Sequence, residues 1–362
     1  MTHQRETRFE LARWVTEKGP RAKYNLGTSG IPGRMAGDYL PGRELGVGSA
    51  IFDGDVELRE IIAKRYKRSV EEVALTASAS EANFLVFFAF LSKGGTVVVE
   101  SPSYQPLMRL GEMFDARIKW LDRRFDDRYS IDLESLKRLV KGSRLVVLTN
   151  LHNPSGVAIP PATLRAAAEI ALDAGAWVLC DEIYRDFVPD TTTTAVDLGD
   201  NCIVTASLSK VYGFGGIKIG WTVATREMTE RLQSVREMGS VCCSRLDEEV
   251  AKKVLTDRRL VREAISISRR NLPIVKRWVE RSDRVEWVVP DGGILCFPRL
   301  KGVRDTMAFA NRLFDEYGTL VSPGEYFGSS GHVRLCFGGS AEVIEGGLDA
   351  IDKALQKHKT RP

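Results

Sequence analysis

Three polar clusters come directly after three short apolar runs in the middle of the chain, and their side chains suit acid–base and carbonyl chemistry. Asn153 lies in the first cluster, Asp181 and Tyr184 in the second, and Lys210 in the third. A lysine amine that is neutral for part of the time attacks aldehydes, and a carboxylate in a dry site needs a cation beside it. Each cluster alone has an ordinary explanation as a turn, a helix cap or a solvated charge. Their order and spacing favour one shared site.

The apolar runs that precede these clusters predict strands covered on both faces, because they are short, continuous and rich in β-branched residues. They cover residues 96–100, 145–149, 176–180, 202–206 and 221–224. Amphipathic stretches between them, such as residues 161–174, predict helices. This alternation indicates an α/β fold with a doubly wound, mostly parallel sheet. Ligands bind outside the carboxyl ends of strands in such sheets, so the three clusters are expected to converge on one crevice.

The pattern changes after residue 225. Long charged helices are predicted over residues 227–255 and 261–281, followed by short strands near 285–289, 293–297 and 333–337 and a last helix from Ala341. We interpret this region as a smaller α+β domain. The predicted organisation is an N-terminal segment over residues 1–40 that packs on the small domain, a large domain over 41–260 and a small domain over 261–362.

The composition of the 362 residues is that of a globular protein, with 43% hydrophobic and 28% charged residues. The formal net charge of +4 is small for this length and gives no reason to expect a nucleic-acid or membrane partner. The first residues have no apolar core of a signal peptide, and six cysteines are too few for a disulfide framework, so a cytoplasmic protein is expected. His152 has no metal-ligand partners at useful spacing, so we expect no metal site and a hydrogen bond within its loop.

The order Asn-Pro-x-Gly, Asp-x-x-Tyr, Ser-x-x-Lys resembles the class I aminotransferases, which are pyridoxal-phosphate enzymes of fold type I. Further matches at residues 24–32, 55–59, 101–104, 321–328 and 333–335 extend the resemblance over most of the chain. It implies a large cofactor-binding α/β domain, a smaller α+β domain and a homodimer with its active site at the subunit interface. It also implies ping-pong transfer of an amino group between an L-amino acid and a 2-oxo acid, a reaction of amino acid metabolism.

The resemblance gives these residues roles around pyridoxal 5′-phosphate. Lys210 forms the Schiff base and then carries a proton between the substrate and the cofactor. Asp181 pairs with the pyridine nitrogen and keeps it protonated. Tyr184 and Asn153 bind the phenolic oxygen, and Tyr104 stacks on the ring. Lys210, Asp181 and Tyr184 are therefore the expected catalytic residues.

The phosphate is expected at the start of an apolar helix over residues 82–91. Backbone amides and the helix dipole there favour an anion, and the donors are Ala79, Ser80 and Glu81, with a hydroxyl from Ser207. The family usually has arginine where this chain has Lys218. Lysine neutralises phosphate as a point charge but lacks the two-pronged fork of arginine, so weaker retention of the cofactor is expected.

The substrate is expected to contact Arg334, Asn153 and Gly30. Arg334 matches the arginine that binds the α-carboxylate, a planar pairing that fixes the Cα–H bond relative to the ring. A dicarboxylic substrate needs a second arginine, and the sequence leaves Arg21, Arg34 and Arg43 open for that role. The tyrosine that the family commonly supplies from the partner subunit aligns near Ser49, with Tyr39 as the nearest alternative.

Other functions are compatible with parts of the sequence. The same cofactor supports elimination, decarboxylation or ring formation, so a lyase or a cyclising synthase on the same fold is the alternative to aminotransfer. The Ser-x-x-Lys motif also occurs in penicillin-binding hydrolases, but the companion Ser-Asp-Asn and Lys-Thr-Gly motifs are absent. A regulator with a helix-turn-helix module is not expected, since only a short segment precedes Asn25.

Overall fold

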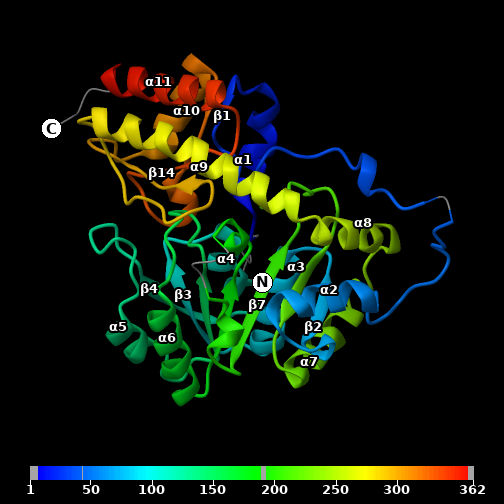
Figure 1. The fold of residues 1–362 in the computed structure, drawn as a ribbon. Coiled ribbons are helices and arrows are strands. Elements are labelled where there is room, and N and C mark those ends of the chain that lie inside the picture. The colour runs from blue at the N-terminus through cyan, green and yellow to red at the C-terminus, as the bar shows by residue number, and fades with distance from the viewer. Residues whose placement is uncertain (1–6, 43, 189–192, 358–362) are drawn as a thin grey trace, which may run out of the picture.

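The computed structural model describes residues 7–42, 44–188 and 193–357. Its larger unit is built on a sheet of seven strands in the order β2-β8-β7-β6-β5-β3-β4 (Figure 1). The strands are β2 (Val73–Thr76), β3 (Thr96–Ser101), β4 (Arg117–Asp122), β5 (Leu145–Thr149), β6 (Trp177–Asp181), β7 (Cys202–Ser207) and β8 (Gly220–Val223). All neighbours from β4 to β7 pair in parallel, whereas β8 is antiparallel to both β2 and β7. The predicted mostly parallel sheet is thus confirmed.

Helices cover both faces of this sheet. One face packs on α2 (Val56–Tyr66), α5 (Leu133–Leu139) and α6 (Pro161–Asp173), and the other on α3 (Ala79–Leu91), α4 (Gln105–Met113) and α7 (Arg226–Glu237). Successive side chains of a strand point to opposite faces, and in β3 Val97 and Val99 join the cluster of α3 whereas Val98 joins that of α2. Both faces are therefore apolar, which explains the continuous hydrophobic runs in the sequence.

Helix α3 crosses the centre of this unit and begins at the candidate site. Its N-cap, Ser78, accepts a hydrogen bond from the amide of Glu81, as its hydroxylic start predicts. Strand β8 passes directly beneath this turn, and a Cβ on Gly220 would lie 2.4 Å from the carbonyl carbon of Ser78. Only glycine fits at that point of β8, so the helix start is held close to the sheet.

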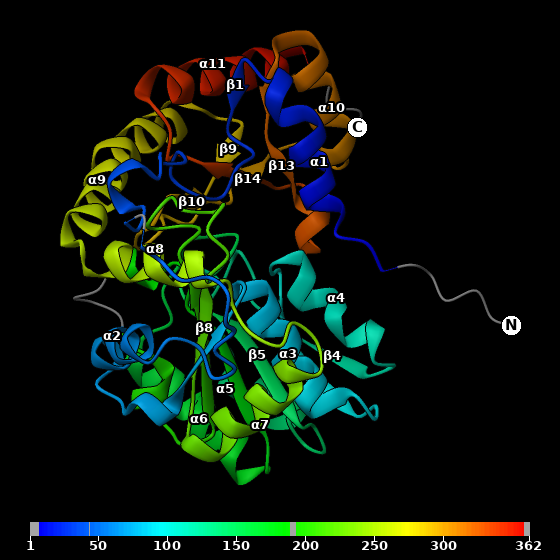
Figure 2. The same cartoon turned by 90° about the vertical axis from the view of Figure 1, so that its right-hand side faces the viewer.

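The smaller unit lies above the carboxyl ends of the strands (Figures 1 and 2). Its helices are α9 (Arg258–Arg281), α10 (Thr306–Tyr317) and α11 (Ala341–Lys357). Its short strands are β9 (Val285–Glu286), β10 (Leu295–Cys296), β11 (Arg299–Leu300), β12 (Thr319–Leu320), β13 (Ser322–Pro323) and β14 (Val333–Cys336). The N-terminal α1 (Glu10–Lys18) packs beside them, and β1 (Tyr24–Asn25) pairs in parallel with β12.

The helix predicted over residues 227–255 is wrong, because the structure divides it into α7 and α8 (Arg245–Thr256). Gly239 comes just after the end of α7, and Val241 takes a left-handed backbone conformation with φ of +65° that a continuing helix does not allow. Ser244 then caps α8 by accepting from the amide of Asp247. The short strands of the smaller unit are also briefer than predicted.

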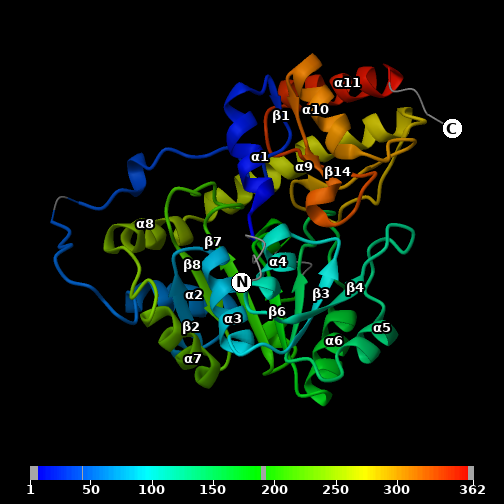
Figure 3. The same cartoon turned by 180° about the vertical axis from the view of Figure 1, so that it is seen from behind.

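Residues 33–42 and 44–54 run out from the body of the molecule before the chain returns to α2 (Figures 1 and 3). Their described elements amount to a single short 3₁₀ turn at Gly37–Tyr39. No helix in the described residues has the length and apolar character needed to cross a bilayer.

Candidate active site

The three polar clusters meet at the carboxyl ends of β5, β6 and β7, where they line one cavity of about 130 Å³. Asp181 is the last residue of β6, and Lys210 lies just beyond β7. Asn153 lies in the loop after β5 and faces the smaller unit through Arg334. The predicted crevice is confirmed in its position, and its lining includes Tyr104, Asn153, Asp181, Tyr184, Lys210 and Lys218.

Lys210 is half-buried at the cavity, and its amine donates a hydrogen bond of 2.7 Å to Oγ of Ser29. Burial, reinforced by the positive charge of Arg334, lowers the pKa of the Lys210 amine to about 8. A substantial fraction of the amine is therefore neutral near pH 8, the form that attacks an aldehyde.

Asp181 is held in one orientation by two donors. The side-chain amide of Asn83 donates to Oδ2 over 2.9 Å, and the amide of Ile183 donates to Oδ1 over 3.1 Å. Burial raises the pKa of the Asp181 carboxyl to about 6, and the hydrogen bonds from Asn83 and Ile183 and the charge of Lys210 offset this desolvation only in part. The carboxylate is thus prepared for a cationic partner inside the cavity.

Asn83 itself was not expected from the sequence. It lies in the otherwise apolar α3, and its Oδ1 accepts a hydrogen bond of 2.7 Å from the hydroxyl of Thr205 on β7. This bond fixes which end of the Asn83 amide faces Asp181. A polar residue on an all-apolar helix was the available signal, since such a group is buried only when it is hydrogen-bonded.

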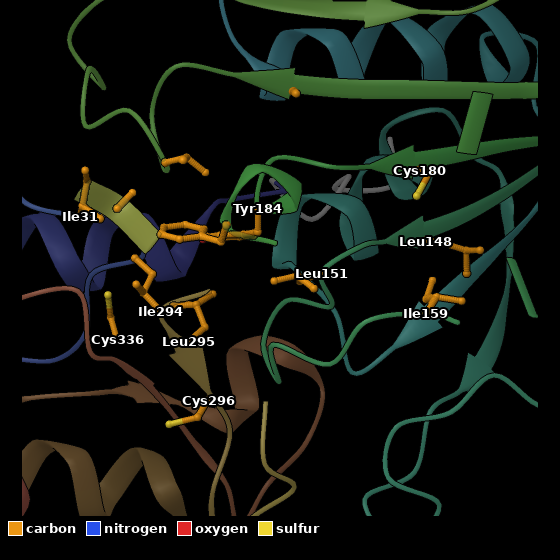
Figure 4. Close-up of a cluster of buried hydrophobic side chains, with 14 of the residues drawn as sticks. Ile31, Leu148, Leu151, Ile159, Cys180, Tyr184, Ile294, Leu295, Cys296 and Cys336 are labelled. Atoms are coloured by element: carbon orange, nitrogen blue, oxygen red, sulfur yellow. The ribbon is translucent and has the colours of Figure 1, made fainter. Parts of the chain in front are cut away.

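Both predicted tyrosines line the cavity. The hydroxyl of Tyr184 donates to the carbonyl of Ser29 over 2.7 Å, and its ring belongs to the apolar cluster that includes Ile31 and Leu151 (Figure 4). Tyr104 precedes α4, and the ring of Phe9 packs edge-on against it with centroids 5.4 Å apart. Burial raises the pKa of the Tyr104 hydroxyl to about 12, so this ring stays neutral.

Hydroxyls and backbone amides gather at the end of the cavity beside α3. Ala79, Ser80 and Ser207 line it as expected, and Ser209 adds a second hydroxyl 2.9 Å from that of Ser207. Glu81 is not brought into the cavity, because its amide is already bonded to the Ser78 cap. The helix start offers an anion site made of the remaining donors.

Lys218 also lines the cavity, with a side chain that is largely exposed. Its own backbone amide donates to Oδ2 of Asp247 over 3.3 Å, which anchors the loop before β8. A single exposed ammonium attracts an anion without fixing its orientation.

Arg334 on β14 is only 2% exposed and reaches from the smaller unit toward Asn153. Its Nη1 donates to Oδ1 of Asn153 over 3.3 Å, while Nη2 contacts the carbonyls of Gly27 and Thr28 and the hydroxyl of Ser322 over 3.2–3.3 Å. Its Nε is buried with no hydrogen-bond partner among the described residues. The contacts of Nη1 and Nη2 are all 3.2 Å or longer, and Nε has no partner among the described residues. A planar guanidinium in this state is suited to bind a carboxylate with two parallel hydrogen bonds.

A buried network of hydrogen bonds and one ion pair holds the loop of Asn153 in place. The amide of Asn153 donates to Oγ1 of Thr149, whose hydroxyl donates to Oε1 of Glu100 over 2.5 Å. Arg123 pairs with the other oxygen of Glu100 over 2.7 Å, and both charged side chains are fully buried. His152 bonds Ser155 over 2.6 Å within the loop, as predicted.

The remaining candidates lie outside the cavity lining. Gly30 lies against the backbone of Ser209 and Lys210, since a Cβ on Gly30 would lie 3.2 Å from the carbonyl oxygen of Ser209 and 3.7 Å from Cα of Lys210. Arg21 is on the surface 4.0 Å from Glu17, and Arg34 pairs with Glu263 over 2.8 Å. Arg43 falls outside the described residues.

The partner-subunit tyrosine also remains a prediction. Tyr39 donates its hydroxyl to Asp257 over 2.7 Å and packs edge-on against Phe214. That hydroxyl is thus engaged within its own chain. Ser49 is exposed on the outlying segment.

The residues present fit the ring nitrogen, the phosphate and the aldehyde of pyridoxal phosphate. Asp181 is a buried carboxylate that forms no ion pair with any described residue, and a pyridinium nitrogen would supply the cation. The donors at the start of α3 suit the phosphate, and the Lys210 amine suits the aldehyde. The unpartnered Nε of Arg334 suits the carboxylate of an amino acid.

Comparisons with known proteins agree with this chemistry. The sequence model of the family described as aminotransferase class I and II matches residues 49–351. Capreomycidine synthase of Streptomyces vinaceus is 28% identical, over 96% of this chain and 94% of its own. A PLP-dependent aminotransferase from Streptococcus suis 89-1591 superposes with a TM-score of 0.90 at 26% identity, covering 98% of this chain and 99% of its own. The PLP-dependent cyclase OrfR superposes with a TM-score of 0.88 at 26% identity over 99% of both chains.

Proposed function

Since the chain belongs to the aminotransferase class I and II family, we propose that it moves an amino group between an L-amino acid and a 2-oxo acid. Its cofactor is pyridoxal phosphate, as in the solved relative from Streptococcus suis. The observation that carries the proposal is that Lys210 and Asp181 line one cavity together with Asn153, and that Arg334 reaches this cavity through its hydrogen bond to Asn153. These groups are the base, the electrostatic partner and the carboxylate clamp that the reaction needs.

When bound, the cofactor supplies an electron-accepting ring that stabilises negative charge on the substrate Cα. The chain's own residues then have separate tasks. Arg334 binds the substrate carboxylate and fixes the orientation of the Cα–H bond. Lys210 in its neutral form would take the proton from Cα and, as an ammonium, would give it to the carbon of the cofactor that carries the aldehyde. Asp181 stays ionised next to the ring and keeps the ring nitrogen protonated.

A cyclising synthase is the second candidate. The observation in its favour is that one relative aligned over nearly the whole chain is named a synthase and one superposed structure is named a cyclase. Both reactions begin with removal of the Cα proton, so Lys210, Asp181 and Arg334 would serve either. The outcome depends on whether the substrate carries a leaving group beside Cα.

The products of a donor panel distinguish the two functions. The purified protein with pyridoxal phosphate is incubated with each amino acid and a 2-oxo acid, and the products are analysed by mass spectrometry with ¹⁵N-labelled donors. Aminotransfer places ¹⁵N on the acceptor oxo acid. Retention of ¹⁵N in a product that has lost water, with no labelled acceptor, favours the cyclising synthase instead.

We also propose a homodimer. Its support is the outlying segment, where Met35, Val47 and Phe52 are 89%, 66% and 61% exposed. Met238 in the turn before α8 is also 87% exposed. Several exposed apolar side chains on one segment are typical of a protein–protein interface. The family resemblance implies that the partner is a second copy of this chain. Sedimentation equilibrium is expected to give twice the monomer mass, and a monomer at micromolar concentration would contradict the proposal.

The proposed organisation remains an N-terminal segment over residues 1–40, a large domain over 41–260 and a small domain over 261–362. The pairing of β1 with β12 supports the placement of the first segment on the small domain. We further propose a cytoplasmic setting. All six cysteines lie in the described residues and are free thiols, which suits a reducing compartment.

Replacing Lys218 by alanine is expected to weaken cofactor binding by about fivefold, since one exposed point charge near a phosphate is worth about 1 kcal/mol. Lys218→Arg is the matched control and is expected to bind at least as tightly as the wild type, because arginine adds a two-pronged contact. Dissociation constants for pyridoxal phosphate from fluorescence titration test both. Unchanged affinity in the alanine variant would remove Lys218 from the phosphate site.

A further inference from the structure

Ser29 connects the N-terminal segment to the candidate catalytic lysine through both its side chain and its backbone. Its Oγ accepts a hydrogen bond of 2.7 Å from Nζ of Lys210, and its carbonyl accepts one of 2.7 Å from the hydroxyl of Tyr184. Ser29 also lines the cavity. No sequence motif had assigned it a role.

The position of Ser29 is fixed from both sides. After it, the amide of Ile31 donates to the carbonyl of Lys210 over 3.3 Å. Before it, the carbonyl of Gly27 accepts from the hydroxyl of Ser322 over 2.9 Å. A serine held in this way presents its hydroxyl to one place in the cavity, and the Lys210 amine occupies that place.

A hydroxyl suits a partner whose protonation state alternates. The lysine side chain has four rotatable bonds, so an amine that is not covalently bound swings freely unless something holds it. A serine hydroxyl accepts from an ammonium and donates to a neutral amine. A backbone carbonyl accepts only and would favour the ammonium alone. Ser29 therefore stays bonded to Lys210 before and after the lysine gains a proton.

We propose that Ser29 is a positioning residue that holds the Lys210 amine in both protonation states while the amine carries a proton to and from the substrate. This inference rests on the proposed function, because it gives Ser29 a task only if Lys210 is the proton carrier. Ser29 acts through Lys210, and the burial that lowers the lysine pKa also strengthens their hydrogen bond.

The first experiment measures Lys210 directly and needs no turnover. Full-length protein freed of cofactor is labelled with acetic anhydride across a pH series, and mass spectrometry reports acetylation of Lys210. The Ser29→Ala variant is expected to lower the labelling midpoint by about half to one pH unit, because the lost contact favoured the ammonium more than the amine. Ser29→Thr restores the midpoint. Ser234→Ala is the matched control, since Ser234 is exposed on α7 and is not among the described residues that line the cavity.

The second experiment measures the loaded enzyme. Ser29→Ala is expected to lower kcat and the exchange of the substrate α-deuterium with solvent by about tenfold to a hundredfold. KM should stay within about threefold, because Arg334 and not Ser29 binds the substrate. The Ser29→Thr variant recovers most of the rate. The melting temperatures of all variants check that the fold is intact.

The outcomes separate this inference from the proposed function. If the wild type transfers amino groups but Ser29→Ala leaves the Lys210 labelling midpoint or kcat unchanged, the role of Ser29 is overturned and the proposed function stands. A wild type that neither transfers nor exchanges the α-hydrogen overturns the proposed function, and the role of Ser29 falls with it. A lowered midpoint together with a lowered kcat and rescue by threonine supports both.

Discussion

Replacement of Lys210 by alanine is expected to lower the rate of amino-group transfer by about 10⁴-fold, the upper range for loss of a positioned acid–base group. The variant also loses the covalent bond to the cofactor, so the visible band of the bound cofactor should vanish or move. The physical reason is that Lys210 is the buried amine at the cavity beside Asp181, with a pKa of about 8 that keeps part of it neutral. Steady-state kinetics and absorption spectra of the reconstituted protein measure both effects.

Two variants serve as controls for this loss. Lys210→Arg keeps a positive charge but cannot form the Schiff base, so it should be as inactive as the alanine variant. Lys218→Ala removes the neighbouring lysine of the same cavity and should keep both the visible band and most of the rate. A Lys210→Ala protein within about tenfold of wild-type activity would show that another group carries the proton.

Arg334→Leu is expected to raise the KM of every amino acid by about a hundredfold or more, because hydrogen bonds to charged groups contribute about 1.5–3 kcal/mol each. The visible band of the bound cofactor should remain, since Arg334 contacts Asn153 and the segment of Gly27 but does not line the phosphate end of the cavity. Initial-rate kinetics over a range of donor concentrations separate the change in KM from any change in kcat.

Arg334→Lys tests the geometry of this contact. Lysine keeps the charge but loses the planar fork and the free Nε, so its KM should lie between those of the wild type and of Arg334→Leu. Because Arg334 is buried, the melting temperature of each variant has to be measured as well. A KM within about threefold of the wild type in a folded Arg334→Leu protein would place the carboxylate elsewhere.

The strand ends and the polar residues just beyond them were predictable from the sequence. Each of Asp181, Asn153 and Lys210 comes after a continuous apolar run, and the parallel sheet brings such positions to one edge. The antiparallel direction of β8 was not predictable, because an apolar run of four residues has the same pattern in either direction. The break between α7 and α8 depends on a left-handed residue, Val241, and valine is not a residue type that predicts this conformation.

Ser29 and Asn83 show why part of the site was missed. Ser29 lies in an irregular segment, and the pairing of β1 with β12, the contacts of Gly27 and the bond of Ile31 to the Lys210 carbonyl bring it to Lys210. Asn83 acts on Asp181 across the face of the sheet, a contact between distant segments that no local spacing encodes. Glu81 was also expected at the phosphate, but it is not among the described residues that line the cavity, and its amide donates to the Ser78 cap that starts α3. Long-range packing thus decides which of several suitable groups faces the cavity.

The central claim is that Lys210 and its cavity use pyridoxal phosphate to remove an amino group from an amino acid. The most direct measurement is a single half-reaction, in which reconstituted protein is mixed with one amino acid at a time and no oxo acid. At least one donor is expected to abolish the visible band of the bound cofactor and to release one 2-oxo acid per subunit, while its nitrogen stays with the protein. Release of ammonia or of a cyclic product in repeated turnovers, with the band retained, would contradict aminotransfer and favour the cyclising synthase.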